Sequence, residues 1–145
     1  MNNHKLNQRG FTLIEIMVVV VILGILAAIV VPRLLDEPEK ARRTSAATQI
    51  QSFESALGIF KLENGFYPST EQGLKALVTK PTVGRVPAHY KAGGYIRKIP
   101  VDPWGQPYLY LYPGVHSNLD LFSYGPDGET GGEGEDADIA NWDLE

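Results

Sequence analysis

The chain has 145 residues, no cysteine and a net charge of −4, but its charged side chains are unevenly distributed. All 13 basic side chains fall within residues 1–98, whereas residues 99–145 carry ten acidic side chains and no basic one. Such an acidic C-terminal third argues against a nucleic-acid partner and favours a bound cation or a basic partner. Because no disulfide can form, a structural metal or packing into an oligomer would have to compensate for a small core.

The first predicted element is an apolar helix. Residues 16–32 contain no charged side chain, and Glu15 lies directly before them. A helix over residues 11–32 would be roughly 33 Å long, about the thickness of the hydrocarbon core of a bilayer. A lone carboxylate beside such a run is costly unless it is paired, so Glu15 is a candidate functional residue.

Three interpretations fit residues 1–35. The first is a secretory signal with a basic start and a cleavage site near residues 26–28, although the apolar run is longer than usual. The second is a plain membrane anchor, with Lys5 and Arg9 on the cytoplasmic side. The third is cleavage of the bond between Gly10 and Phe11. That cut would create a positive α-amino group on Phe11, which the Glu15 carboxylate of a neighbouring copy could neutralise.

The sequence RGFTLIE at residues 9–15 resembles the class III signal of type IV pilins and of their relatives in secretion systems, the pseudopilins. The resemblance implies that a prepilin peptidase cuts between Gly10 and Phe11 and that the new Phe11 amine is N-methylated. It also implies a reservoir of subunits in the membrane and assembly into a helical filament. In that filament Glu15 would dock against the N-terminus of a neighbouring subunit.

A second helical pattern follows the apolar run. Its apolar residues are spaced by 4, 3, 4 and 3 positions: Ala46, Ile50, Phe53, Leu57 and Phe60. This spacing predicts a helix that packs one stripe on a small core, in preference to a coiled-coil seam. Residues 11–62 would then form one long helix, and the pair Asn64-Gly65 would terminate it. Gly24 and Pro32 are weak points in it, and the resemblance implies local melting between them on assembly.

The remaining elements are short. Ser69 and Gln72 have capping-box spacing and predict a short helix that continues through residues 73–78. Three prolines within residues 100–107 exclude a regular central strand there. Residues 108–112 and 119–123 alternate in the manner of strands, and the turn residues 113–118 join them into a hairpin. The predicted fold class is therefore α+β, with a long N-terminal helix packed on a small antiparallel sheet.

Over its whole length the sequence resembles the major pseudopilins of type II secretion systems, which have a type IV pilin-like fold. Seven short segments carry this resemblance: YP (67–68), TEQGL (70–74), GYI (94–96), DPWG (102–105), SYGPDG (123–128), DI (138–139) and NW (141–142). Type IV pilins generally carry a C-terminal cysteine pair, and its absence favours a pseudopilin. The alternative is a type IV pilin of a surface fibre for adhesion, motility or DNA uptake.

The resemblance implies a major structural subunit of the pseudopilus, a helical periplasmic fibre that drives export of folded proteins across the outer membrane. Residues 1–10 would be a leader that is removed, residues 11–35 the transmembrane and assembly helix, and residues 36–145 a periplasmic domain. The subunit would reside in the inner membrane as a single-pass protein before it enters the fibre. Besides other copies of itself, it would meet the prepilin peptidase and methyltransferase, minor pseudopilins, an inner-membrane assembly platform and an outer-membrane secretin channel.

Residues 124–138, here called the acidic loop, consist mainly of glycine and acidic residues. Composition alone is compatible with a disordered, solvated loop. The alternative is a calcium site, since calcium binds six to eight oxygens from carboxylates and from carbonyls at tight turns. The resemblance to major pseudopilins implies such a site. Its ligands would be the side chains of Asp127 and of either Asp136 or Asp138, with carbonyls near Tyr124 and Glu129.

No catalytic constellation is visible in the sequence. The three histidines, His4, His89 and His116, are far apart, and the last two are expected to be surface residues in loops. Neither a Ser/His/Asp arrangement nor a phosphate-binding loop is present, so the chain is not expected to be an enzyme. Trp104 and Trp142 are expected to pack against the core. Arg97 and Lys98 would either be solvated or pair with an acid of a neighbouring copy, such as Glu54.

Overall fold

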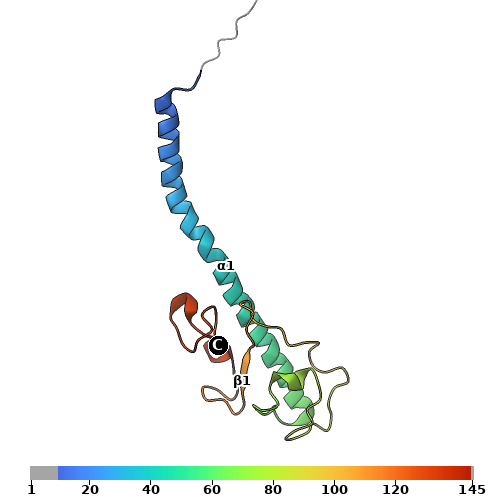
Figure 1. Cartoon of the computed structure of the whole chain (residues 1–145). Helices are drawn as coiled ribbons and strands as arrows, with labels where there is room; N and C mark the ends of the chain where they lie inside the picture. Colours follow the sequence, from blue (N-terminus) through green and yellow to red (C-terminus); the bar gives the residue numbers. More distant parts are fainter. Residues whose placement is uncertain (1–9, 145) are drawn as a thin grey trace, which may run out of the picture. The chain divides into compact units, whose positions relative to one another are not determined.

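The computed structural model describes residues 10–144, and within residues 31–37 it describes the backbone but not the side chains. Predictions that concern residues 1–9, including Lys5, Arg9 and most of the leader, lie outside the described residues. The chain divides into two compact units between Pro38 and Glu39. The helix α1 at Leu13–Asn64 contributes residues to both units (Figure 1). It continues through Gly24 and Pro32. Local melting between these two residues concerns the assembled filament and stays a prediction.

The second unit has its core along the predicted apolar stripe of α1. All five residues of the stripe are buried, with exposed fractions of 0–3 %: Ala46, Ile50, Phe53, Leu57 and Phe60. Burial of a large apolar side chain stabilises a fold by about 1.5–3 kcal/mol, so the stripe is a major source of stability for the unit. Phe60 packs edge-on against Phe66, with ring centroids 5.8 Å apart, and 5.2 Å from Tyr95. The amphipathic prediction is confirmed.

A three-stranded antiparallel sheet completes the α+β architecture that the sequence predicts. Strand β1 is Leu109–Leu111, β2 is Asp120–Ser123 and β3 is Ile139–Ala140, in the order β1-β2-β3. In the predicted hairpin, Leu109 pairs with Phe122 and Leu111 with Asp120. The hairpin is confirmed, with strands shorter than predicted, whereas β3 was not predicted because two residues carry no alternation to detect.

The capping box forms, but the helix that it was expected to start does not follow directly. The Gln72 backbone N–H donates to Ser69 Oγ (3.3 Å), and the Ser69 backbone N–H donates to Gln72 Oε1 (3.1 Å). Gly73 then adopts a φ of 59° and a ψ of −167°, which no helix accommodates. The element after it is a 3₁₀ helix, η1, at Leu74–Leu77, so a short helix is present within the predicted range 73–78 but is shorter than predicted.

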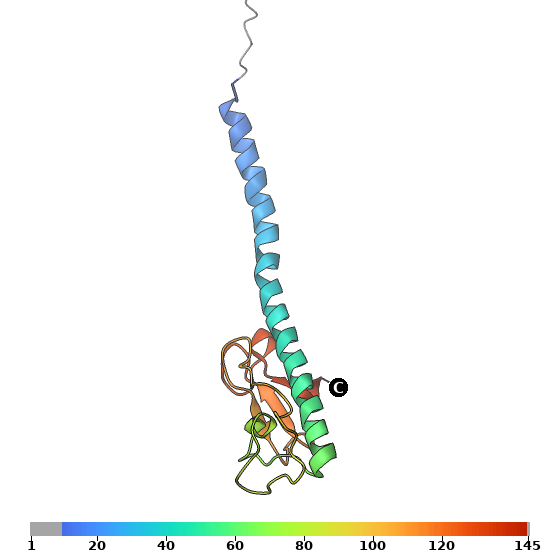
Figure 2. The ribbon, with the colours of Figure 1, turned by 90° about the vertical axis from the view of Figure 1, so that its right-hand side faces the viewer.

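The C-terminal third of the chain lies beside the part of α1 that belongs to the second unit (Figure 2). It contains two further 3₁₀ turns, η2 at Gly134–Asp136 and η3 at Asn141–Asp143. Asn141 joins this segment to α1 and to the sheet. Its Nδ2 donates to Glu54 Oε1 (2.9 Å) and its Oδ1 accepts the Leu121 N–H (2.9 Å). Glu54 therefore has a partner within its own chain.

Candidate functional site

The predicted cleavage site lies just outside the start of α1. Gly10 and Phe11 are exposed and precede the helix, and Phe11 is 79 % exposed. Thr12 caps the helix: its Oγ1 accepts the Glu15 N–H (3.3 Å), and its carbonyl accepts the N–H groups of Glu15 (3.1 Å) and Ile16 (3.3 Å). A peptide bond in this position is accessible to a protease, whereas one inside a helix is not.

Glu15 occupies the first turn of α1. The unpaired N–H groups of a first turn carry a partial positive charge, which favours a carboxylate there. The Thr12 cap was not predicted, although threonine three residues before an acid is a recognisable start signal for a helix.

The helix that follows Glu15 presents apolar side chains on every face. Leu13–Val30 is long and apolar enough to span a bilayer. Its large apolar side chains are 46–82 % exposed, and none of that segment is buried inside the chain. An apolar surface of this extent needs lipid or other protein copies to cover it.

Strands β2 and β3 close the base of the acidic loop. Ser123 pairs with Ile139 and Phe122 with Ala140, so the residues that flank the loop lie opposite each other in the sheet. Most of the loop between these strands is exposed. Its glycines provide the tight turns: Gly132 has a φ of 83°, and a Cβ there would collide with the Asp136 carbonyl.

Asp138 organises one side of the acidic loop and has an unused oxygen. Its Oδ2 accepts the Gly131 N–H (3.0 Å), and its own N–H donates to the Gly131 carbonyl (3.1 Å). Its Oδ1 is buried and has no hydrogen-bond partner among the described residues. A buried carboxylate oxygen without a donor is costly, and a cation beside it would remove that cost.

The other predicted ligands are distributed around the same loop. Asp127 is exposed, and its Oδ1 accepts the Glu129 N–H (3.1 Å), which sets the turn there. Asp136 is exposed in η2, and Tyr124 is half-buried with its ring 5.6 Å from that of Phe122. Within residues 10–144 no three acidic or histidine side chains converge on one point. A cation in this loop would therefore need backbone carbonyls as well as carboxylates.

Arg43 of α1 fixes the far side of the acidic loop, a role that the sequence did not reveal. Its Nη1 donates to the carbonyls of Glu135 (2.9 Å) and Ala137 (2.7 Å), more than ninety positions away in sequence. A guanidinium between two carbonyls supplies charge-assisted hydrogen bonds that hold the loop against the helix. Basic residues in this part of α1 are common, so no sequence pattern distinguishes this one.

A buried carboxylate holds the turn beside the loop. Asp120 is completely buried and accepts the N–H groups of Val115 (2.7 Å), His116 (3.0 Å) and Ser117 (2.9 Å). Burial opposes its ionisation, but these donors outweigh that effect, so the pKa of the Asp120 carboxyl lies below its usual value.

His116 and Trp142 contact each other beside this turn. His116 Nδ1 lies 3.1 Å from Asp120 Oδ2, and its imidazole is more than half exposed, which agrees with a surface histidine. The ring stacks on Trp142 at 4.1 Å between centroids. A cavity of about 240 Å³ is lined by both rings and by Asp138, so the turn and the acidic loop are neighbours.

A buried carboxylate also organises the segment with three prolines. Asp102 Oδ1 accepts the N–H groups of Trp104 (3.1 Å) and Gln106 (2.7 Å), and its Oδ2 accepts the Ser123 hydroxyl (2.6 Å). Trp104 packs against the core, as expected, and its Nε1 donates to Glu39 Oε1 (3.0 Å).

Comparison with known proteins gives consistent matches along the chain. Residues 33–142 match the protein family described as type II secretion system protein G, and residues 5–31 match the prokaryotic N-terminal methylation motif. The chain is 61 % identical to the type II secretion system core protein G of Pectobacterium carotovorum over 95 % of this chain and 86 % of that protein. It is 56 % identical to the protein of the same name from Vibrio cholerae, over 95 % of this chain and 94 % of that protein.

A solved structure agrees with these matches. The crystal structure of the major pseudopilin from the type 2 secretion system of enterohaemorrhagic Escherichia coli superimposes with a TM-score of 0.70 at 46 % identity. It covers 77 % of this chain and 92 % of that one.

Proposed function

The chain belongs to the family of type II secretion system protein G, the major pseudopilins, and from this premise we propose how its residues serve a secretion fibre. Its function is that of a structural subunit of the type II secretion pseudopilus, and it is not an enzyme. The observation that carries the proposal is the division of α1. One part exposes apolar side chains from Leu13 to Val30, and the other places its stripe in a core.

The proposed maturation step is cleavage between Gly10 and Phe11, followed by N-methylation of Phe11. The match of residues 5–31 to the methylation motif and the exposed position of this bond ahead of the Thr12 cap support it. After cleavage Phe11 begins the mature chain, and its amine lies one helical turn from Glu15 along the sequence.

Glu15 is proposed to pair with the Phe11 amine of a neighbouring copy during assembly. In lipid the two charges are poorly screened, so they attract each other far more strongly than a surface ion pair. Removal of one partner leaves a buried charge uncompensated, which costs several kcal/mol by the general rule for buried pairs, about 3–5 kcal/mol. The pair would thus select correctly seated subunits.

Two measurements test these steps. The intact mass of the protein recovered from membranes should correspond to a chain that begins at Phe11 and carries one methyl group. Glu15→Gln keeps the shape of the side chain and removes its charge, and it should abolish fibres and secretion while the subunit still accumulates in the membrane. A mass that includes residues 1–10, or normal fibres from Glu15→Gln, would contradict the proposal.

Calcium is the cofactor proposed for the acidic loop. The buried, unpartnered Oδ1 of Asp138 supports this assignment, and so does the chemistry of a loop built from glycine turns and carboxylates. Asp127 and Asp138 would hold the ion with carbonyls near Tyr124 and Glu129, and Asp136 is the alternative second carboxylate. When bound, calcium would supply positive charge that links these oxygens and would stabilise the C-terminal third without a disulfide.

A calcium titration of the full chain in detergent tests the site. A ligand at 100 times its dissociation constant stabilises the native state by about 2.7 kcal/mol, so calcium should raise the melting temperature and a chelator should reverse the effect. Asp138→Asn should remove the response, whereas Asp143→Asn, an exposed acid five residues later, should retain it. An identical response from both variants would contradict the assignment.

The proposed location follows from the apolar part of α1. It would anchor the subunit in the inner membrane with the N-terminus in the cytoplasm and the second unit in the periplasm, until assembly moves the subunit into the fibre. The partners proposed are other copies of this chain, the prepilin peptidase and methyltransferase, minor pseudopilins, the inner-membrane platform and the outer-membrane secretin. The proposed action of the fibre is to drive folded proteins across the outer membrane.

A further inference from the structure

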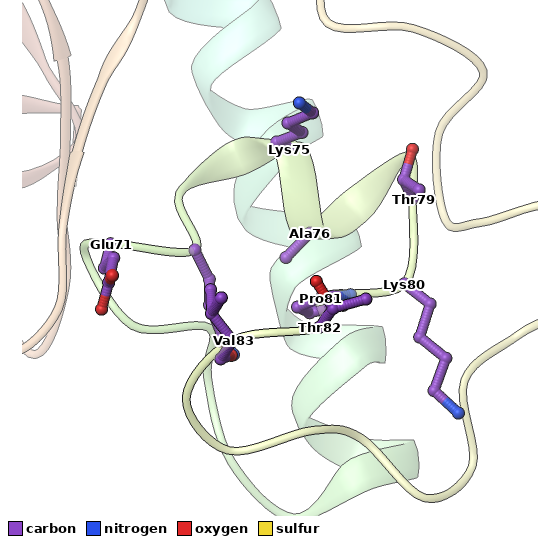
Figure 3. A pocket seen from close by; sticks show the side chains of 9 residues that line it. Glu71, Lys75, Ala76, Thr79, Lys80, Pro81, Thr82 and Val83 are labelled. Atoms are coloured by element: carbon purple, nitrogen blue, oxygen red, sulfur yellow. The ribbon is translucent and has the colours of Figure 1, made fainter.

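A surface groove beside η1 has no role in the function described above. It has a volume of about 300 Å³ and is lined by residues within 71–83, among them Lys75 and Lys80; we call it the lysine groove. Figure 3 shows the side chains of Lys75 and Lys80 extending in different directions, with Ala76 and Pro81 between them and Glu71 at a distance from Lys80. Both lysines are exposed, and their ammonium groups have no hydrogen bond or ion pair among the described residues.

Buried hydrogen bonds hold the lysine groove in shape. Gln72 is buried, and its Nε2 donates to the carbonyls of Val83 (2.6 Å) and Arg85 (3.0 Å), which fixes the outer wall. The same side chain accepts the Ser69 N–H in the capping box. The groove is therefore preorganised, and a partner would not have to order it on binding.

The groove lies in a basic part of the second unit. Residues 61–91 carry five basic and two acidic side chains, a net charge of +3. Tyr95 connects this region to the end of α1. Its N–H donates to the Leu77 carbonyl of η1 (2.7 Å), while Asn64 Nδ2 donates to its hydroxyl (2.8 Å).

The acidic loop is attached to the opposite end of this part of α1. Arg43 holds it through the carbonyls of Glu135 and Ala137, and Arg43 and Asn64 are roughly twenty residues apart on one helix, or about 30 Å along its axis. The loop carries six acidic and no basic side chains, a net charge of −6, and a bound calcium would leave it at −4. Glu133 and Glu135 are exposed, and their carboxylates have no partner among the described residues.

We propose that the lysine groove of one subunit receives the acidic loop of another, with Lys75 and Lys80 facing Glu133 and Glu135. A basic groove at one end of the unit and an acidic loop at the other cannot meet within one chain. Between copies they form a heterologous, head-to-tail contact, which produces an open filament instead of a closed ring. The inference rests on the proposed assembly of the chain into a fibre and names a contact within that fibre.

The second copy is the occupant that the charges favour. The loop and the groove have opposite net charge, and complementary surfaces steer association and select the register. A single exposed ion pair contributes little, but this contact recurs at every subunit along a fibre. The groove also contains Glu71, whose carboxylate would repel an acidic segment beside it. The acidic loop is therefore expected at the end of the groove that holds Lys80.

Cysteine cross-linking in cells that assemble the fibre tests the contact, because the chain has no cysteine of its own. A chain with Lys80→Cys and Glu133→Cys should form disulfide-linked dimers and higher multimers under mild oxidation. A bond within one copy is excluded, since a disulfide requires Cα atoms less than about 7 Å apart. The control replaces Lys80→Cys with Lys98→Cys, which is also an exposed lysine but lies outside the groove, and should give no multimers.

Charge exchange gives a second measurement. Lys75→Glu with Lys80→Glu should cause loss of fibres, and so should Glu133→Lys with Glu135→Lys. All four changes together should restore fibres. Fibres by electron microscopy without cross-links between positions 80 and 133, or no restoration by the combined variant, would overturn this contact and leave the proposed function intact. Absence of fibres from the unsubstituted chain would overturn both.

Discussion

Replacement of Asp120 with asparagine should destabilise the second unit far more than its small change in structure suggests. The carboxylate is fully buried and divides its two oxygens among the N–H groups of three successive residues. Oδ2 accepts Val115 and His116, and Oδ1 accepts Ser117. Asparagine has the same size but only one acceptor oxygen, so its amide NH₂ must face at least one of these donors.

The magnitude follows from those contacts. A hydrogen bond to a charged group contributes about 1.5–3 kcal/mol, and a buried N–H left without an acceptor costs about 1–3 kcal/mol. We expect Asp120→Asn to lower the free energy of unfolding by about 3 kcal/mol, which corresponds to roughly 13 °C in melting temperature for a unit of this size.

Urea unfolding of the full chain in mild detergent, followed by tryptophan fluorescence, measures this quantity. Trp142 is a suitable reporter because its ring stacks on His116 in the same turn. Asp143→Asn is the matched control, since that carboxylate is exposed and its loss should change stability by less than about 0.5 kcal/mol. If Asp120→Asn changes stability as little as the control does, the account of the turn is wrong.

Three further predictions follow from the second unit. The pKa of Asp120 is lower in the folded chain than in the unfolded chain, so the stability that this carboxylate contributes is present above the unfolded pKa and is lost as the pH falls through the folded pKa. The difference in stability between the native chain and Asp120→Asn should therefore shrink below about pH 4. Phe60→Ala removes a fully buried ring and should cost about 3–5 kcal/mol, whereas Leu62→Ala, at a position that is 85 % exposed, should be almost neutral in the same urea assay. Gly132→Ala should weaken calcium-dependent stabilisation more than Gly134→Ala. Both glycines have a positive φ, but only at Gly132 would a Cβ collide with a neighbouring carbonyl. Equal effects in the calcium titration would show that backbone conformation alone matters.

The main features of the fold could be predicted because they depend on periodicity. The stripe from Ala46 to Phe60 repeats at helical spacing, and all five of its residues are buried. The hairpin of β1 and β2 was found from alternation on both sides of a turn. Gly65, with a φ of 82°, follows the last residue of α1, as the Asn-Gly pair predicted.

Features that depend on one residue or on distant contacts could not be predicted in the same way. The capping box at Ser69 correctly indicated local hydrogen bonds, but the extended ψ of Gly73 separated it from the following turn. Strand β3 exists because it pairs with β2 and not because of its own two residues. Arg43 acts on carbonyls more than ninety positions away, and no local pattern distinguishes it from the nearby basic residues.

The acidic C-terminal third satisfies its buried carboxylates without a lysine or arginine of its own. Residues 99–145 have no lysine or arginine, so within this segment buried carboxylates rely on backbone N–H groups and on neutral side-chain donors such as hydroxyls. Asp120 uses backbone donors, Asp102 adds the Ser123 hydroxyl, and among the carboxylates of the described residues only Asp138 retains a buried oxygen without a donor. A buried carboxylate oxygen without a donor is costly, so Asp138 Oδ1 is the position at which the proposed calcium ion would stabilise the chain most.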